Sequence, residues 1–159
     1  MNKLVKNGLY IAGGALVVSS IVGFKKYEKV KAIFDVMEIE PESISKFDIN
    51  IASQSIRFNL DVLLKNNSKE DLFVTGSAFA ILKEIDLFYK DFYIATAKVS
   101  INEISIPGEN QLIIKNIPVV VHAVNILQNI SSLIDFKVEN LGVIGIIEAF
   151  GKTYRIGEE

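Results

Sequence analysis

The sequence predicts a mainly β protein: an antiparallel β-sandwich of the immunoglobulin or fibronectin kind, with one short amphipathic helix and an N-terminal hydrophobic helix. Apolar and polar residues alternate through "SIRFNLDVLLKN" (55–66), the pattern of a strand with one buried face. About eight such short segments recur between turn signals, which favours a sandwich over a parallel α/β sheet. A charge-free apolar run near the amino terminus predicts the hydrophobic helix.

Composition limits the chemistry that the chain can carry. Its 159 residues suffice for one domain plus an anchor, and half of them are hydrophobic. The sequence has no cysteine, so disulfides, thiolate metal sites and a cysteine nucleophile are excluded. A single histidine, His122, makes a zinc site or a Ser-His-Asp triad hard to assemble. We therefore expect no cofactor, no metal and no catalytic residues, and hence a protein that is not an enzyme.

Charge is distributed unevenly along the chain. Residues 1–31 contain six lysines against Glu28, a charge of +5. The total of −2 then leaves −2 − 5 = −7 for residues 32–159. Clustered lysines are attracted to anionic lipid headgroups, whereas an acidic body is repelled by phosphate backbones. The pattern predicts a membrane-facing amino terminus and no nucleic-acid partner.

Residues 9–24, "LYIAGGALVVSSIVGF", are sixteen uncharged residues between lysines. As a helix they extend about 24 Å, slightly less than a ~30 Å hydrocarbon core, and flanking lysines can make up the difference. We expect a single-pass bilayer anchor whose orientation is left open. A cleaved signal peptide and a helix buried in a protein assembly are the alternatives. Ala15, Ser19 and Gly23 form a stripe of small residues and are a candidate helix-packing face.

The predicted domains are therefore residues 1–32, an anchor helix and basic linker, and residues 33–159, the sandwich. The linker helix is expected to end before Pro41. Further segments read as strands: "FDVMEIE", "SKFDINI", "LFVTGSAFAILKEI", 91–101, 110–122, 133–139, 143–151 and 153–156. Residues 102–110 read as a turn. Residues 123–133, "AVNILQNISSL", have apolar residues at helical spacing and predict a short helix that covers the core.

Three segments resemble the late embryogenesis abundant type 2 domain, also called the water stress and hypersensitive response domain. They are "FNLDVLLKNNS", "IDLFYKDFYIATAKVSINEISIPGENQ" and "LIDFKVENLGVIGIIEAFGKTYRI". The resemblance covers about residues 33–157 and departs from the family at Asn67, where the family usually has proline. It implies a fibronectin-like sandwich, often behind one hydrophobic anchor, with structural, protective or binding roles and no catalytic residues.

The densest aromatic group in the chain is Phe88, Tyr89, Phe92 and Tyr93, a candidate interaction surface if its members are exposed together. The competing interpretation is that alternate members fill the core. Glu84, Asp86 and Asp91 lie nearby, but the stretch lacks the ligand order of a calcium loop and reads as solvated hairpin charges.

The leading functional hypothesis is a non-enzymatic, membrane-anchored sandwich with a structural, protective or partner-binding role, through a protein partner or self-association. A structural subunit of a large assembly, such as a phage virion or an envelope complex, is the first alternative. A carrier of an apolar ligand is the second, although sandwiches of this size fill their interior with side chains.

Overall fold

The computed structural model describes residues 27–74, 80–102, 104–122 and 136–157. The chain divides into two compact units, Met1–Ala32 and Ile33–Glu159. Residues 27–34 are helical. In the part of the chain that is described, no helix combines the length and the hydropathy needed to cross a bilayer. The predicted anchor at 9–24 and the predicted helix at 123–133 lie outside the described residues.

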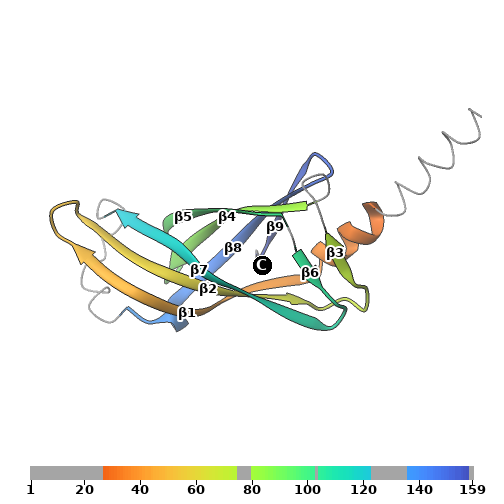
Figure 1. The fold of residues 1–159 in the computed structure, drawn as a ribbon, viewed down its shortest axis with the longest axis horizontal. Coiled ribbons are helices and arrows are strands. Elements are labelled where there is room, and N and C mark those ends of the chain that lie inside the picture. Colours follow the sequence, from red (N-terminus) through yellow and green to blue (C-terminus); the bar gives the residue numbers. More distant parts are fainter. Residues whose placement is uncertain (1–26, 75–79, 103, 123–135, 158–159) are drawn as a thin grey trace, which may run out of the picture. The chain divides into compact units, whose positions relative to one another are not determined.

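The second unit is mainly β. Its described elements, in chain order, are β1 Met37–Asn50, β2 Ser55–Asn66, β3 Leu72–Val74, β4 Ala80–Tyr89, β5 Phe92–Ile101, β6 Ile104–Ile106, β7 Asn110–His122, the 3₁₀ turn η2 Val138–Asn140, β8 Leu141–Ala149 and β9 Lys152–Ile156. They form two main antiparallel sheets, β1-β2-β7 and β5-β4-β8-β9, and a small antiparallel pair, β3-β6. The arrangement is sandwich-like (Figure 1).

β2 is the central strand of the three-stranded sheet. Phe58, Leu60, Val62 and Leu64 alternate along it and are at most 2% exposed. This alternation places one face of the strand in the core. The flanking strands each carry a proline, Pro41 opposite Val62 and Pro118 opposite Asn59. Because proline cannot donate a ladder hydrogen bond, it is tolerated on edge strands, and both of these strands are edges of their sheet.

Tight turns of matching geometry close two hairpins of the four-stranded sheet. Tyr89 pairs with Phe92 around Lys90 and Asp91, whose φ angles are 47° and 67°. Ala149 pairs with Lys152 around Phe150 and Gly151, which also have positive φ. Two consecutive positive φ angles match the right-handed twist of the flanking strands.

The two main sheets enclose the core. A Cβ added to Gly145 of β8 would lie 3.2 Å from Cδ1 of Ile39 of β1, so the sheets are in close contact there. At the end of the sandwich where β1 stops, the Phe136 ring bridges the layers. Its centroid lies 5.6 Å from that of Phe58 in β2 and 4.8 Å from that of Tyr89 in β4. Phe136 therefore closes this end of the core.

Most predicted strands are present, and four predictions were wrong in detail. The segment 72–85, predicted as one strand, contains β3 and the start of β4, which belong to different sheets. The two opening strands are one continuous strand, β1, interrupted by register shifts at Pro41/Ser43 and Ser45/Asp48. The predicted turn at 102–110 contains β6. The predicted strand at 133–139 is not a strand where it is described, because β8 already has β4 and β9 on its two sides and Phe136 is used to fill the core.

Candidate functional site

The four candidate aromatic residues lie around the β4–β5 hairpin, on opposite sides of the sheet. Tyr89 is 4% exposed, and its ring stacks on Phe136 inside the core. Phe92, its cross-strand partner, is 60% exposed at the end of the sandwich. Phe88 is half-buried on the outer face of the sheet and pairs with Tyr93, which is 50% exposed. The sequence cluster is therefore split, and only Phe88 and Tyr93 share the outer face.

Phe88 and Tyr93 form an aromatic pair on that face. Their ring centroids are 5.9 Å apart at an interplanar angle of 72°, an edge-to-face contact. The tight Lys90-Asp91 turn fixes the register that brings the two residues opposite each other. The pair is thus held by backbone geometry as well as by ring contact.

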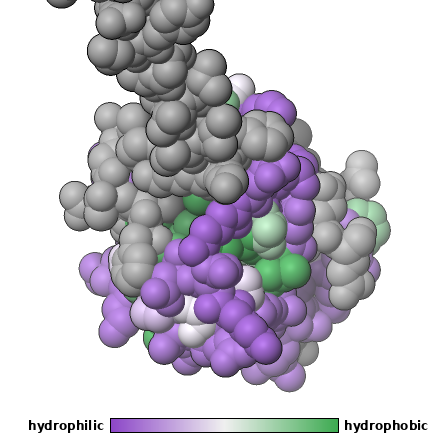
Figure 2. Space-filling view, turned by 90° about the vertical axis from the view of Figure 1, so that its right-hand side faces the viewer, coloured by the Kyte–Doolittle hydropathy of each residue, from purple (hydrophilic) through white to green (hydrophobic). Residues whose placement is uncertain are grey.

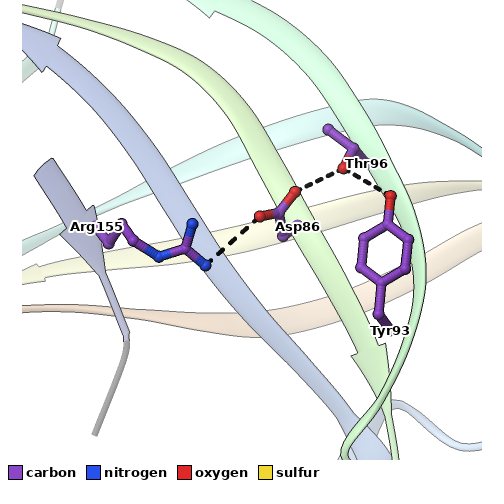
Figure 3. A network of polar contacts seen from close by, with 4 residues as sticks. All are labelled: Asp86, Tyr93, Thr96 and Arg155. Atoms are coloured by element: carbon purple, nitrogen blue, oxygen red, sulfur yellow. Dashed lines mark hydrogen bonds and ion pairs between the residues drawn. The ribbon is translucent and has the colours of Figure 1, made fainter. Parts of the chain in front are cut away.

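A polar network continues from Tyr93 across the outer face (Figure 3). The Thr96 hydroxyl donates to Oδ1 of Asp86 at 2.6 Å, and the Tyr93 hydroxyl lies 3.0 Å from that of Thr96. On the other side of Asp86, Nη2 of Arg155 lies 3.7 Å from Oδ2. The Asp86 side chain is only 18% exposed. Its carboxylate lies on β4 and contacts Thr96 of β5 and Arg155 of β9, so it joins three strands.

The remainder of the outer face mixes apolar and charged side chains. Ile144 lies opposite Asp86 and Ile146 lies opposite Arg155, and both isoleucines are half-buried. Lys83 and Glu148 form an ion pair at 3.2 Å at the far end of the face. We call Phe88, Tyr93, Asp86, Thr96, Ile144, Ile146 and Arg155 the outer-face site. It offers apolar area beside oriented hydroxyl and guanidinium groups, which is suited to recognition of a partner.

The predicted hairpin charges do not form a metal site. Asp86 accepts a hydrogen bond from Thr96 and forms an ion pair with Arg155, and Asp91 lies in the turn. The described ranges contain no group of three or more candidate metal ligands. His122 is exposed at the end of β7, opposite Ser55. The predicted helix-packing residues Ala15, Ser19 and Gly23 lie outside the described residues.

A second group of polar contacts surrounds Asn66. The sequence predicts only a turn at this position. The Asn66 side chain is 1% exposed, and Nδ2 donates to the carbonyls of Glu70, Ile106 and Pro107 at 2.8, 3.1 and 3.2 Å. Its Oδ1 accepts from the backbone N–H and the hydroxyl of Ser68. Asn66 therefore joins the end of β2 to the connection between β6 and β7, a structural role.

An acidic row follows the outer side of β1. Lys65 Nζ donates to Oε2 of Glu40 at 2.7 Å. This hydrogen bond, with the charges of Glu40, Glu38 and Glu42, raises the pKa of Lys65 above its ordinary 10.5, and desolvation opposes the rise. Charges and a proline on an edge strand discourage unwanted pairing with other sheets.

Two pockets lie on the described surface. A pocket of about 360 Å³ lies beside Asn66 and is lined by Lys65, Asn66, Asn67, Glu109, Asn110 and Gln111. A pocket of about 470 Å³ is lined by residues just before and at the start of β1, including Phe34 and Met37, and by residues of β9, including Tyr154. Figure 2, which views the right-hand side of Figure 1, shows hydrophobic residues in the middle of a largely hydrophilic face.

Sequence reasoning located the hairpin but missed four members of the outer-face site: Ile144 and Ile146 of β8, and the polar pair Thr96 and Arg155. Thr96 lies directly opposite Asp86, and this register depends on a shift at Leu87/Phe88 that local sequence does not reveal. Arg155 reaches Asp86 from β9, nearly seventy residues later in the chain. The sequence carries only a weak signal for them: a polar residue on the outward side of each strand.

Neither a known family model nor a curated protein matches the chain. Among solved structures, the chain is similar to a protein from Archaeoglobus fulgidus known from a crystal structure, with 8% sequence identity and a TM-score of 0.35. The similarity covers 73% of this chain and 89% of the archaeal chain. At this level it carries no argument about function.

Proposed function

We propose that the chain is a non-enzymatic interaction protein: a membrane-anchored sandwich of the late embryogenesis abundant type 2 kind, with a fibronectin-like body, that binds a partner protein through its outer-face site. The observation that carries the proposal is the Phe88–Tyr93 pair, which places half-exposed aromatic surface next to the Asp86–Thr96–Arg155 network. Aromatic residues and arginine are the side chains that most often dominate binding at interfaces.

The polar network supports this role because its hydrogen bonds and ion pair hold the side chains in place before a partner binds. Tyr93 has its hydroxyl 3.0 Å from Thr96, and Asp86 is held from both sides. Side chains that are already fixed lose less conformational entropy on binding than mobile ones. The site also contains two aromatic residues and an arginine, which are residue types enriched at interfaces.

The membrane part of the proposal rests on the sequence. Residues 9–24 are uncharged, and lysines flank them on both sides. In the sequence, the sandwich follows directly after the basic linker. The resemblance of residues 33–157 to the late embryogenesis abundant type 2 domain agrees with an anchored sandwich of this kind.

The test is photo-crosslinking of the full-length chain in intact cells. A photoreactive phenylalanine analogue replaces Tyr93 in one variant and Ile113 in a control variant; Ile113 is 39% exposed on the other sheet. The proposal predicts a discrete protein adduct from position 93, recovered with the membrane fraction, and none from position 113. Equal adducts at both positions, or none at position 93, would contradict the outer-face part. Full recovery of the intact chain in the soluble fraction would separately contradict the anchor.

A further inference from the structure

Exposed apolar side chains gather at one end of the sandwich. The three most exposed large hydrophobic residues of the described chain are Ile51, Ile49 and Phe92, at 86%, 62% and 60%. Phe47, at 43%, adjoins them in sequence. We call Phe47, Ile49, Ile51 and Phe92 the apolar tip.

The members of the apolar tip come from two segments at the same end of the sandwich. Phe47, Ile49 and Ile51 lie at the end of β1 and in the following turn, which Asn50 and Ser55 close. Phe92 lies on the β4–β5 hairpin, opposite Tyr89. The Phe136 ring connects the segments, because its centroid is 5.7 Å from Phe47 and 4.8 Å from Tyr89.

The same end differs in charge from the rest of the body. Its described charged residues are the cations Lys46, Arg57, Lys90 and Lys137 and the anions Asp48, Asp91 and Glu139, a sum of 4 − 3 = +1. The described residues of 32–159 together hold 11 lysines and arginines and 14 aspartates and glutamates, a sum of 11 − 14 = −3. An anionic surface therefore repels most of the body but not this end, so the tip is the part that can approach it.

We propose that the apolar tip docks on an anionic phospholipid bilayer. Isoleucine and phenylalanine side chains that protrude from turns can enter the headgroup region, and lysines beside them meet the lipid phosphates. Lys46 directly precedes Phe47, and Lys90 lies two residues before Phe92. A fluid lipid surface accepts protruding side chains from separate turns, whereas a protein partner would need a surface of matching shape.

The apolar tip lies far from the point where the chain enters the sandwich. β1 starts at Met37, just after the linker, and ends at Asn50 beside the tip. Fourteen strand residues at ~3.3 Å each place the tip roughly 40 Å from the point where the chain enters the sandwich. A chain anchored through its amino terminus would then carry a second lipid-binding end. This inference goes beyond the proposed function and does not depend on what binds the outer-face site.

A two-vesicle capture experiment tests the proposal with the full-length chain. The protein is reconstituted into phosphatidylcholine vesicles fixed to beads, and retention of the chain on the beads reports the anchor. Fluorescent vesicles of phosphatidylcholine with phosphatidylglycerol are then added, and their capture reports the tip. The triple variant Ile49→Ser, Ile51→Ser, Phe92→Ser is compared with wild type and with the control Ile113→Ser, which alters an exposed apolar residue elsewhere.

The proposal predicts capture by wild type and by the control, at least a tenfold loss in the triple variant, and weaker capture of pure phosphatidylcholine vesicles. The double variant Lys46→Gln, Lys90→Gln, which retains the apolar side chains, is expected to lower capture several-fold. No capture by wild type, or capture unchanged in the triple variant, would overturn the proposal. Bead-to-bead clustering in place of vesicle capture would assign the tip to a second copy of the chain and would also overturn it. Failure of the chain to stay on the beads would contradict the anchor instead.

Discussion

Nδ2 of Asn66 donates a hydrogen bond to the carbonyl oxygen of Ile106, 3.1 Å away and forty residues further along the chain. The amide makes the same kind of contact with Pro107 and Glu70, while its oxygen accepts from Ser68. One buried side chain thus satisfies backbone groups from two separate connections. Asparagine is suited to this position because its amide donates and accepts at once.

Replacement of Asn66 by alanine is expected to destabilise the fold by roughly 1–3 kcal/mol, because the buried carbonyl of Ile106 and the part-buried carbonyls of Glu70 and Pro107 lose their donor. The exposed neighbour Asn67 is the matched control, and Asn67→Ala should change the free energy of unfolding by less than about 0.5 kcal/mol. Urea unfolding followed by circular dichroism measures both. Equal effects of the two substitutions would mean that Asn66 is an ordinary turn residue.

Gly108 permits the close approach of two connections. A Cβ at this position would lie 2.5 Å from the carbonyl oxygen of Lys69, so Gly108→Ala must displace backbone and should cost about 1–3 kcal/mol. Gly151 provides a contrast: its φ is +70° and a Cβ there would meet nothing within 4 Å. Gly151→Ala should cost only about 1 kcal/mol, from backbone strain. Thermal unfolding that ranks Gly151→Ala as the more harmful change would refute the close approach.

Phe136 joins the two sheets through ring contacts with Phe58 and Tyr89. Phe136→Ala should destabilise by about 2–3 kcal/mol, less than the 3–5 kcal/mol of a fully buried ring, because Phe136 is only half-buried. Phe92→Ala removes the same group from an exposed site and should cost less than about 1 kcal/mol. Similar losses for both variants, measured by denaturant unfolding, would show that Phe136 does not connect the sheets.

The outer-face network should show energetic coupling. In a double-mutant cycle of Asp86→Ala and Thr96→Val, the 2.6 Å hydrogen bond predicts a coupling free energy of about 1–1.5 kcal/mol. The Lys83–Glu148 pair, whose side chains are 41% and 51% exposed, should give less than about 0.5 kcal/mol in the same experiment. Coupling near zero for Asp86 and Thr96 would mean that the network does not hold the site in advance.

The Glu40–Lys65 pair predicts a pH dependence of known sign. The pKa of Lys65 is raised in the folded state, so its stabilising contribution is fully present below the ordinary value of 10.5 and is lost as the pH rises through the raised value. Wild type should exceed Lys65→Gln in stability by a constant, small amount from neutral pH to about pH 9, and the difference should shrink at higher pH. A difference that grew with rising pH would have the wrong sign.

The strands that were predictable from sequence are those in which burial alone decides the pattern. β2 follows apolar alternation, β7 is a short apolar run between turn signals, and both observed strands have the predicted bounds. Phe136, Lys137, Val138 and Glu139 show the same alternation without forming a strand, because no sheet edge is available beside β8. Local pattern indicates which side chains seek burial, but the available strand partners are fixed only by the whole topology.

The candidate site was predictable only in part, for a related reason. The aromatic cluster was visible in sequence, and the two-residue period separates Phe88 from Tyr89 once the strand is accepted. Arg155 could not be associated with Asp86 from the sequence, because their contact requires β8 to lie between β4 and β9. The division of Phe92 from Tyr93 depended on the turn at Lys90 and Asp91.

Cysteine labelling in membranes tests most directly whether a partner protein covers the outer-face site. The chain has no cysteine, so single substitutions at Lys98, which is exposed on β5 two residues after Thr96, and, as control, at Val120 of β7 provide unique labels and leave the Phe88–Tyr93 pair intact. We predict that a polar maleimide reacts quickly with both positions in the purified protein, and that in intact membranes position 98 alone is protected by at least tenfold. Equal labelling rates at position 98 in purified protein and in membranes would contradict the proposed partner.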